Sequence, residues 1–290
     1  MTGVLVRAAP ARPRRRGAEV TFDPEAVRAF EHAGWQRAAE HYAATFAHAT
    51  AAFVGDLLDA ARVGAGLRVL DLACGPGLVA AAAAARGALP VGLDFSSAMI
   101  ARAGAEHPGI RFEEGDAEAL PFADGSFDAV VSNFGVHHVA EPVKAVREAY
   151  RVLGPGGRLA FTTWAAPAEN IAWQLLFDAI AAHGDRSAAN TPPPGGSLRD
   201  PADVLRLLDA AGFTGTEARA THSTWLVSNA SDLVEGFRRG TVRTAALIEA
   251  QPVSALPAIE AAMARGAAAY RRGDGYAVPI VAILGSGVRP

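Results

Sequence analysis

The stretch from Arg68 to Asp94 (RVLDLACGPGLVAAAAAARGALPVGLD) constrains the fold of this chain more than any other part of it. A short apolar run meets Asp71, a turn of small residues follows, and an alanine-rich run leads to a second apolar run that closes on Asp94. This order predicts a strand, a tight loop, a helix and a second strand. Such a parallel βαβ unit carries a ligand loop at the carboxyl end of its first strand.

Five further strand-like runs follow this unit, and helical patterns separate most of them. The predicted strands cover residues 110–113, 127–132, 158–164, 213–225 and 277–284. Strands that alternate with helices are typical of a doubly wound sheet. We therefore predict an α/β protein with a doubly wound, mostly parallel seven-stranded sheet.

Three stretches do not fit the alternation and predict a helical cap. They are residues 19–63, where helical periods cover 34–47 and 49–61, and two insertions at 166–199 and 230–274. The predicted core is then residues 64–165, continued at 200–229 and completed by a final strand within 275–290. Residues 1–18 are basic, proline-punctuated and without an apolar signal-peptide core, which predicts a disordered tail, with a nucleic-acid arm as the alternative.

Composition limits which classes of binding partner this chain is expected to have. The net charge of −3 gives no sign of a nucleic-acid partner, and no apolar stretch approaches the roughly 18 residues of a membrane span. The single cysteine excludes an intrachain disulfide framework and fits a cytoplasmic location. Six histidines lack metal-ligand spacing, so no metal is expected. They are His32, His41, His48, His107, His183 and His222. The sequence leaves open whether the protein forms a homodimer.

The loop after the first predicted strand runs from Gly75 to Ala80 and fits the dinucleotide pattern G-x-G-x-x-G/A, although a tight turn without a ligand would look the same. Asp71 would repel a pyrophosphate there, whereas it suits a positive ammonium group. Asp94 can bind both hydroxyls of a ribose, and Asp116 could meet an adenine amino group. An acid at each of three strand ends indicates a pocket for a cationic nucleoside.

Five segments within residues 64–165 resemble the successive motifs of class I S-adenosylmethionine-dependent methyltransferases. They read VLDLACGPG, VGLDFS, EGDAEALPF, FDAVVSNFGVHHV and RVLGPGGRLAF. The branch they resemble includes the C-methyltransferases of ubiquinone and menaquinone biosynthesis. The resemblance implies a Rossmann-like methyltransferase fold, S-adenosylmethionine as cofactor and S-adenosylhomocysteine as its product.

The resemblance also implies which residues bind the cofactor. The residues implied around the methionine moiety are Asp71, Ala73, Gly75 and Gly77, and Asp94 would bind the ribose. The residues implied along the adenine are Phe95, Met99, Asp116 and Ala117. Asn133 and Val136 would lie near the sulfonium. Ala73 stands where the family often has glycine, and we expect only a slightly tighter loop. Cys74 is expected there for its size.

A sulfonium methyl group is already electrophilic, so methyl transfer mainly needs alignment and exclusion of water. His137 and His138 are the candidate general bases, and the alternative is that both pack structurally. Arg243 could bind an acidic or carbonyl substrate, or lie on a solvated helix face. The aromatic residues expected near the acceptor, with core packing as the alternative, are Trp35, Tyr42, Phe134, Trp164, Trp173 and Trp225.

After the fourth strand, Ser132 to Gly135 lacks the Asn/Asp-Pro-Pro-aromatic motif of nucleic-acid amino methyltransferases. We therefore predict methyl transfer to the oxygen, carbon or nitrogen of a small organic molecule, such as a secondary metabolite or a quinone-like acceptor. One alternative is a methyltransferase fold recruited for another reaction, such as a cyclisation, with the cofactor retained structurally. A non-catalytic binding protein is a third, which the intact cofactor motifs oppose.

Overall fold

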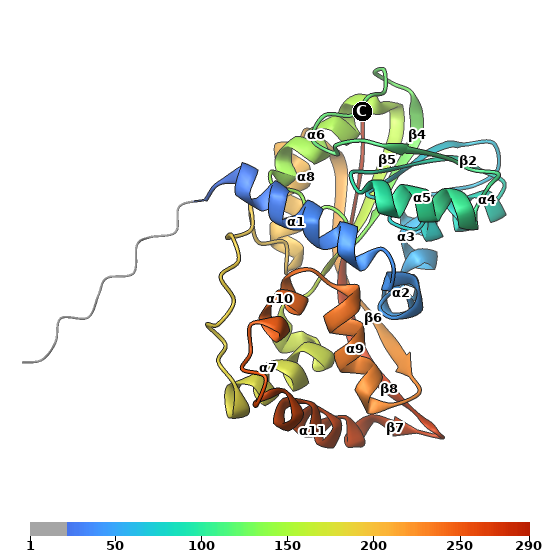
Figure 1. The fold of residues 1–290 in the computed structure, drawn as a ribbon. Helices are drawn as coiled ribbons and strands as arrows, with labels where there is room; N and C mark the ends of the chain where they lie inside the picture. Colours follow the sequence, from blue (N-terminus) through green and yellow to red (C-terminus); the bar gives the residue numbers. More distant parts are fainter. Residues whose placement is uncertain (1–21) are drawn as a thin grey trace, which may run out of the picture.

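A computed structural model describes residues 22–290 (Figure 1). The predicted basic tail at 1–18 lies outside the described residues. The strands are β1 (Arg68–Leu72), β2 (Leu89–Asp94), β3 (Arg111–Glu114), β4 (Phe127–Asn133), β5 (Leu153–Trp164), β6 (Thr214–Val227), β7 (Arg271–Arg272) and β8 (Gly275–Val288). The helices are α1 (Pro24–Ala38), α2 (Ala47–Ala51), α3 (Val54–Ala60), α4 (Leu78–Ala85), α5 (Ser97–Glu106), α6 (Pro142–Val152), α7 (Ile171–His183), α8 (Pro201–Ala210), α9 (Ala230–Gly240), α10 (Arg243–Glu249) and α11 (Leu256–Ala267).

Seven strands form one sheet in the order β3-β2-β1-β4-β5-β8-β6, and the two-residue β7 pairs with β8 beside it. Pairing is parallel from β3 to β5, whereas β8 runs antiparallel to both β5 and β6. The predicted doubly wound, mostly parallel seven-stranded sheet is confirmed. Because β1 and β4 are adjacent and the chain leaves them in opposite directions, their carboxyl ends open a crevice suited to a ligand.

Helices cover both faces of the sheet. On one face α3 and α4 pack through Leu57, Leu58 and Val79 against the buried strand residues Val69 and Val131. On the other face α6 and α8 cover a larger cluster that contains Leu70, Val130 and Phe161. The central strands are apolar on both faces because both faces are covered in this way.

A third layer forms beyond the end of the parallel sheet. β8 pairs with β5 only from Ala282 onward, while its first half continues to pair with β6, so the long hairpin extends past the sheet. Helices α7, α9 and α11 pack on this extension around Trp225, Phe237 and Met263. In Figure 1 these helices, with α10, form the lower half of the molecule, and α1 crosses the boundary between the two halves.

Two sequence predictions about element bounds are wrong. The expected helix over 34–47 breaks after Ala38, because Tyr42 and Phe46 are drawn out of the helical path. The Tyr42 hydroxyl lies 2.9 Å from Thr50 Oγ1, and the Phe46 ring centroid lies 5.2 Å from that of Trp225, so tertiary contacts outweigh local periodicity. The fifth strand starts at Leu153, not at residue 158, because the glycine-rich turn stays extended through a register shift against β4.

Gly240, at the end of α9, tests how closely the N-terminal segment docks on the cap. A Cβ on Gly240 would stand 2.2 Å from the Phe46 Cβ and 3.1 Å from the Phe46 backbone nitrogen. We expect Gly240→Ala to lower the free energy of unfolding in urea by about 2 kcal/mol. Gly55→Ala on α3 is the matched control, since its Cβ would meet nothing within 4 Å. Equal effects of the two substitutions would contradict the docking.

Candidate active site

A cavity of about 540 Å³ lies between the carboxyl ends of the parallel strands and the cap. Its walls come from the loop after β1, the ends of β2, β4 and β5, the helices α1, α7 and α10, and the connection between α7 and α8. The cavity therefore opens at the switch point of the sheet order, where open α/β sheets bind ligands.

The loop after β1 is held in an unusual backbone conformation. Ala73, Gly75 and Gly77 have φ values of +55°, +51° and +85°. The sequence prediction of a merely tighter loop at Ala73 needs correction, because an alanine in the left-handed region costs roughly 1 kcal/mol. Gly135 makes room for this alanine, since a Cβ there would stand 2.5 Å from the Ala73 Cβ.

Gly77 and Val136 do not line the cavity, although the resemblance implied that they touch the cofactor. A Cβ on Gly77 would stand 2.6 Å from the Phe112 ring, so this glycine lets the loop pack against β3. Val136 is buried in the core under α6. The other predicted cofactor residues all line the cavity: Asp71, Ala73, Gly75, Asp94, Phe95, Met99, Asp116, Ala117 and Asn133.

Asp71, which lies at the cavity wall, has a buried carboxylate oxygen without a hydrogen-bond partner. Its carboxylate is buried at the end of β1, where Oδ2 accepts a hydrogen bond of 2.9 Å from the Ala80 backbone nitrogen and Oδ1 has no partner. Burial raises the pKa of Asp71 to about 7, and the nearby Asp94 adds to the rise, while the bond from Ala80 opposes it. A buried carboxylate oxygen without a donor favours a ligand that brings a positive N–H group.

Asp94 connects the ends of β2 and β1. Its Oδ2 accepts a 2.8 Å hydrogen bond from the Gly75 backbone nitrogen, and Oδ1 accepts one of 2.9 Å from the Ser96 nitrogen. Burial raises the pKa of Asp94 to about 6, against the effect of these two bonds. Each oxygen keeps a second lone pair, so the carboxylate can still accept hydrogen bonds from ligand hydroxyls while it fixes the loop.

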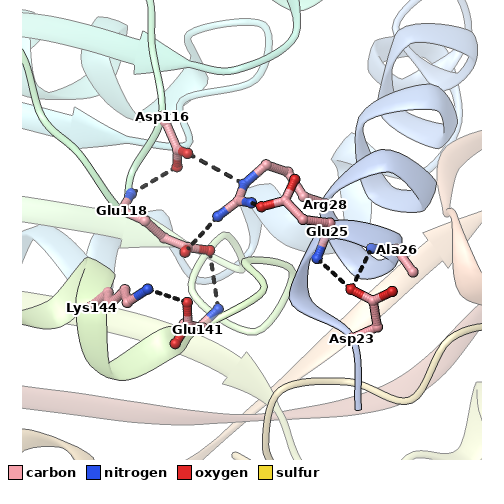
Figure 2. A network of polar contacts seen from close by, with 8 residues as sticks. All are labelled: Asp23, Glu25, Ala26, Arg28, Asp116, Glu118, Glu141 and Lys144. Carbon is pink, nitrogen blue, oxygen red and sulfur yellow. Dashed lines mark hydrogen bonds and ion pairs between the residues drawn. The ribbon is translucent and has the colours of Figure 1, made fainter. Parts of the chain in front are cut away.

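Arg28 on helix α1 lines the cavity beside Asp116 and Glu118, and Figure 2 shows the contacts between these three side chains. The Arg28 guanidinium donates to Glu118 Oε2 at 2.9 Å, and its Nε lies 3.4 Å from Asp116 Oδ2. Asp116 Oδ1 accepts a 2.8 Å bond from the Glu118 backbone nitrogen. Sequence reasoning missed Arg28 and Glu118, because nothing local indicates that a helix 90 residues earlier reaches this loop.

The two histidines lie side by side at the cavity wall, with ring centroids 4.1 Å apart. His138 Nδ1 lies 3.0 Å from Oε2 of Glu31, a fully buried carboxylate on α1. Oε1 of Glu31 accepts a 2.6 Å bond from Arg243 Nε. Burial lowers the pKa of His137 well below its usual value, and the charges of His138, Arg199 and Arg243 lower it further, so His137 is neutral at pH 7.

The predicted acceptor aromatics fall into two groups. Trp35, Tyr42, Phe134, Trp164 and Trp173 line the cavity, while Trp225 is buried in the cap core. Phe134 and Trp164 stack with centroids 4.0 Å apart at 21°, and Trp173 lies 4.7 Å from Trp164. Phe134 holds a left-handed φ of +59° to reach this position. Arg243, predicted either to bind a substrate or to lie on a solvated helix face, lines the cavity and forms an ion pair with Glu31.

Within residues 22–290, no group of three or more histidine, cysteine or acidic side chains is placed to hold a metal ion. The helices of the same residues include none long and apolar enough to cross a bilayer.

Comparisons with known proteins identify the region that builds this cavity. A family profile described as "Methyltransferase domain" matches residues 70–161, which run from β1 into β5. The chain contains a class I S-adenosylmethionine-dependent methyltransferase domain. The chain is 41% identical over 138 residues to the demethylmenaquinone methyltransferase of Renibacterium salmoninarum, covering 46% of this chain and 58% of that protein.

A second relative of the methyltransferase domain is the malonyl-[acyl-carrier protein] O-methyltransferase of Erwinia billingiae, 39% identical over 133 residues, which covers 41% of this chain and 53% of the relative. The match to this chain thus spans little more than half the length of these relatives. Among solved structures, a proposed methyltransferase from Bacillus halodurans superposes with a TM-score of 0.53 at 26% identity, covering 82% of this chain and 98% of that one.

The residues around the cavity fit the methyl donor of this family. Its amino group can supply the N–H donor that Asp71 Oδ1 lacks, and its ribose hydroxyls match the free lone pairs of Asp94. Phe95, Met99 and Ala117 offer apolar surface to an adenine ring. The predicted cofactor agrees with the family, whereas the individual contacts remain predictions.

The raised pKa values predict how cofactor binding depends on pH. Only the ionised carboxylate of Asp71 pairs with an ammonium group, so we expect calorimetry to show the affinity for S-adenosylhomocysteine falling by up to about tenfold per pH unit below about pH 7. Asp71→Asn should bind weakly and with less pH dependence. Asp128→Asn, at the opposite end of β4 and paired with Arg68, should behave like the wild type. A wild-type affinity that stays constant across this range would contradict the assignment.

Stability of the ligand-free protein should change in the opposite sense. Between the ordinary pKa of 3.8 and the folded value of about 7, the folded state holds a proton on Asp71 that the unfolded state has lost. The contribution of this group to the free energy of unfolding is therefore fully present below pH 3.8 and is lost as the pH rises to about 7. Urea unfolding of the wild type and Asp71→Asn should differ in pH slope across this window.

Proposed function

We propose that the protein is an S-adenosylmethionine-dependent methyltransferase that acts on a small aromatic or quinone-like molecule. The observation that carries this proposal is that one cavity joins two different environments. The buried carboxylates of Asp71 and Asp94 line one part, and the stacked rings of Phe134 and Trp164 line another. The names of the quinone-type relatives support an acceptor of this class.

The reaction needs alignment more than chemical activation. The bound donor supplies an electrophilic methyl group on a positively charged sulfur. A lone pair of the acceptor forms the new bond to the methyl carbon as the carbon–sulfur bond breaks, and sulfur keeps that bond's electrons and becomes neutral. Asn133 lies where β4 opens into the cavity, held by Thr162 Oγ1 at 2.7 Å and the Thr50 carbonyl at 3.0 Å. The aromatic walls orient a planar acceptor and exclude water.

An acceptor hydroxyl must also lose a proton, and His138 is the better placed base of the pair. Glu31 fixes the orientation of its ring through Nδ1 and supplies a negative charge that stabilises the imidazolium formed on proton uptake. The edge of Trp35, with centroids 4.9 Å from the His138 ring, supports the same orientation. His137 has no such carboxylate and lies among positive groups, so protonation of its ring is disfavoured.

The test of this function is transfer of a radiolabelled methyl group from S-adenosylmethionine to a panel of hydroxynaphthalenes, reduced quinones and related phenols. We expect label in the acceptor fraction and a matching amount of S-adenosylhomocysteine. Conversion of an acceptor while the label stays on the donor would favour the alternative of a methyltransferase fold recruited for a reaction such as a cyclisation. Donor binding with no conversion of any acceptor would oppose an enzyme for this class.

The contact between His138 and Glu31 predicts how substitution of either residue changes kcat. For a hydroxyl acceptor, His138→Gln should lower kcat by about 10²- to 10⁴-fold. Glu31→Gln should lower kcat by about tenfold, because the His138 ring loses the carboxylate that orients it. Glu40→Gln, exposed just beyond α1, is the control. A Glu31→Gln enzyme with the kcat of the wild type would contradict this role of Glu31.

A further inference from the structure

Charge is divided unevenly around the cavity. The acidic side chains that line it are Asp71, Asp94, Asp116 and Glu118, and all four lie at or just after the carboxyl ends of β1, β2 and β3. The arginines that line it are Arg28, Arg186, Arg199 and Arg243. The last three come from the connection between α7 and α8 and from α10, which adjoin the aromatic acceptor walls.

Two of the four arginines are neutralised by nearby carboxylates. Arg28 pairs with Glu118 and Asp116, and Arg243 pairs with the buried Glu31. No acidic side chain among residues 22–290 comes within ion-pair distance of Arg186 or Arg199, although both line the cavity. The acceptor half therefore holds two uncompensated positive charges and no carboxylate of its own among its lining residues.

The backbone on either side of Arg199 is anchored beside the acceptor walls. The Ala166 nitrogen donates a 3.2 Å hydrogen bond to the Arg199 carbonyl, and the Thr163 hydroxyl donates to the Leu198 carbonyl. Thr163 and Trp164 line the cavity at the end of β5. The positive charge of Arg199 reaches the candidate catalytic histidines, since it contributes to lowering the pKa of His137.

Arg186 lies near the other end of the connection between α7 and α8. Its guanidinium carbon lies 5.3 Å from the ring centroid of Phe177, which also lines the cavity. The buried Gln251 side chain holds the neighbouring Asp185 backbone with bonds of 2.7 Å and 2.8 Å. Both arginines are thus carried on anchored backbone at the acceptor half, where each guanidinium can form charge-assisted hydrogen bonds to a bound anion.

We propose that the acceptor carries a carboxylate or phosphate group, that Arg199 binds this group, and that Arg186 adds a second positive charge to the wall of the same cavity. This inference rests on the proposed function, because it names the chemical class of its acceptor. It adds an anionic anchor to the planar aromatic body, and the anchor sets which end of the acceptor faces the methyl donor.

The test uses three naphthalene probes of similar shape, titrated calorimetrically into the full chain saturated with S-adenosylhomocysteine. They are 1-naphthoate, 1-naphthyl phosphate and the neutral 1-naphthamide. We expect at least one anionic probe to bind about tenfold or more tightly than the amide, as one charge-assisted hydrogen bond would give. The stronger of the two anions identifies carboxylate or phosphate as the natural group.

Arg199→Gln should remove most of the preference for the anion and leave the affinity for naphthamide unchanged, and Arg186→Gln should have a smaller effect in the same direction. Arg206→Gln is the matched control, because Arg206 is an exposed arginine of α8 that pairs with Asp203 and does not line the cavity. It should keep the full preference. Both tested arginines are exposed, so the variants should fold, and a thermal melt verifies this.

Three results would overturn the inference: amide binding as tight as anion binding, no measurable binding of either anion, or a preference that survives the double substitution of Arg186 and Arg199. These failures are separate from failure of the proposed function. A protein that binds S-adenosylhomocysteine and methylates a neutral phenol would keep its function and lose the anionic anchor. A protein that binds no S-adenosylhomocysteine would lose the function itself.

Discussion

The burial of two carboxylates at the ends of adjacent strands is the constraint on which the rest of this site depends. Removing Asp71 and Asp94 from water is costly, and the backbone N–H groups of Gly75, Ala80 and Ser96 offset part of that cost. Asp94 therefore holds the Gly75 loop in place, and that loop adopts three left-handed residues to reach it. The buried Oδ1 of Asp71 has no hydrogen-bond partner within the protein. Because the carboxylate is desolvated, a cationic group that pairs with it would gain more binding free energy than it would in water.

Helix α1 connects this donor region to the acceptor region. Arg28, Glu31 and Trp35 are spaced by three and four residues, so they share one helical face. Arg28 binds the loop after β3, Glu31 orients His138, and Trp35 packs its edge on the same histidine. One helix thereby positions residues in both parts of the cavity. Displacement of α1 would disturb donor binding and proton transfer together.

The sequence predicted the core better than the cap for a physical reason. Asp71, Asp94 and Asp116 follow strands whose apolar runs are legible, and parallel strands bring their carboxyl ends to one edge whatever the loops contain. Glu31 and Arg199 have no such local signal. Glu31 contacts His138, which lies 107 residues away in the sequence, and Arg199 lines the cavity. Trp35 and Trp225 show the same limit, because periodicity indicates burial without saying whether a side chain is buried against a core or a ligand. The break after Ala38 arises in the same way, from contacts of Tyr42 and Phe46 that no window of sequence contains.

The division of charge around the cavity suits a reaction that removes a positive charge. With the proposed anionic acceptor, the sulfonium and the acceptor would attract each other before transfer across a partly enclosed space, and Arg199 would hold the anion in the acceptor half. Transfer would turn the sulfonium into a neutral thioether, so that this attraction would disappear while the repulsion between the product anion and the donor-half carboxylates would remain. Acids at the donor end and arginines at the acceptor end would thus align the two substrates and weaken the binding of the products, without any movement of the sheet.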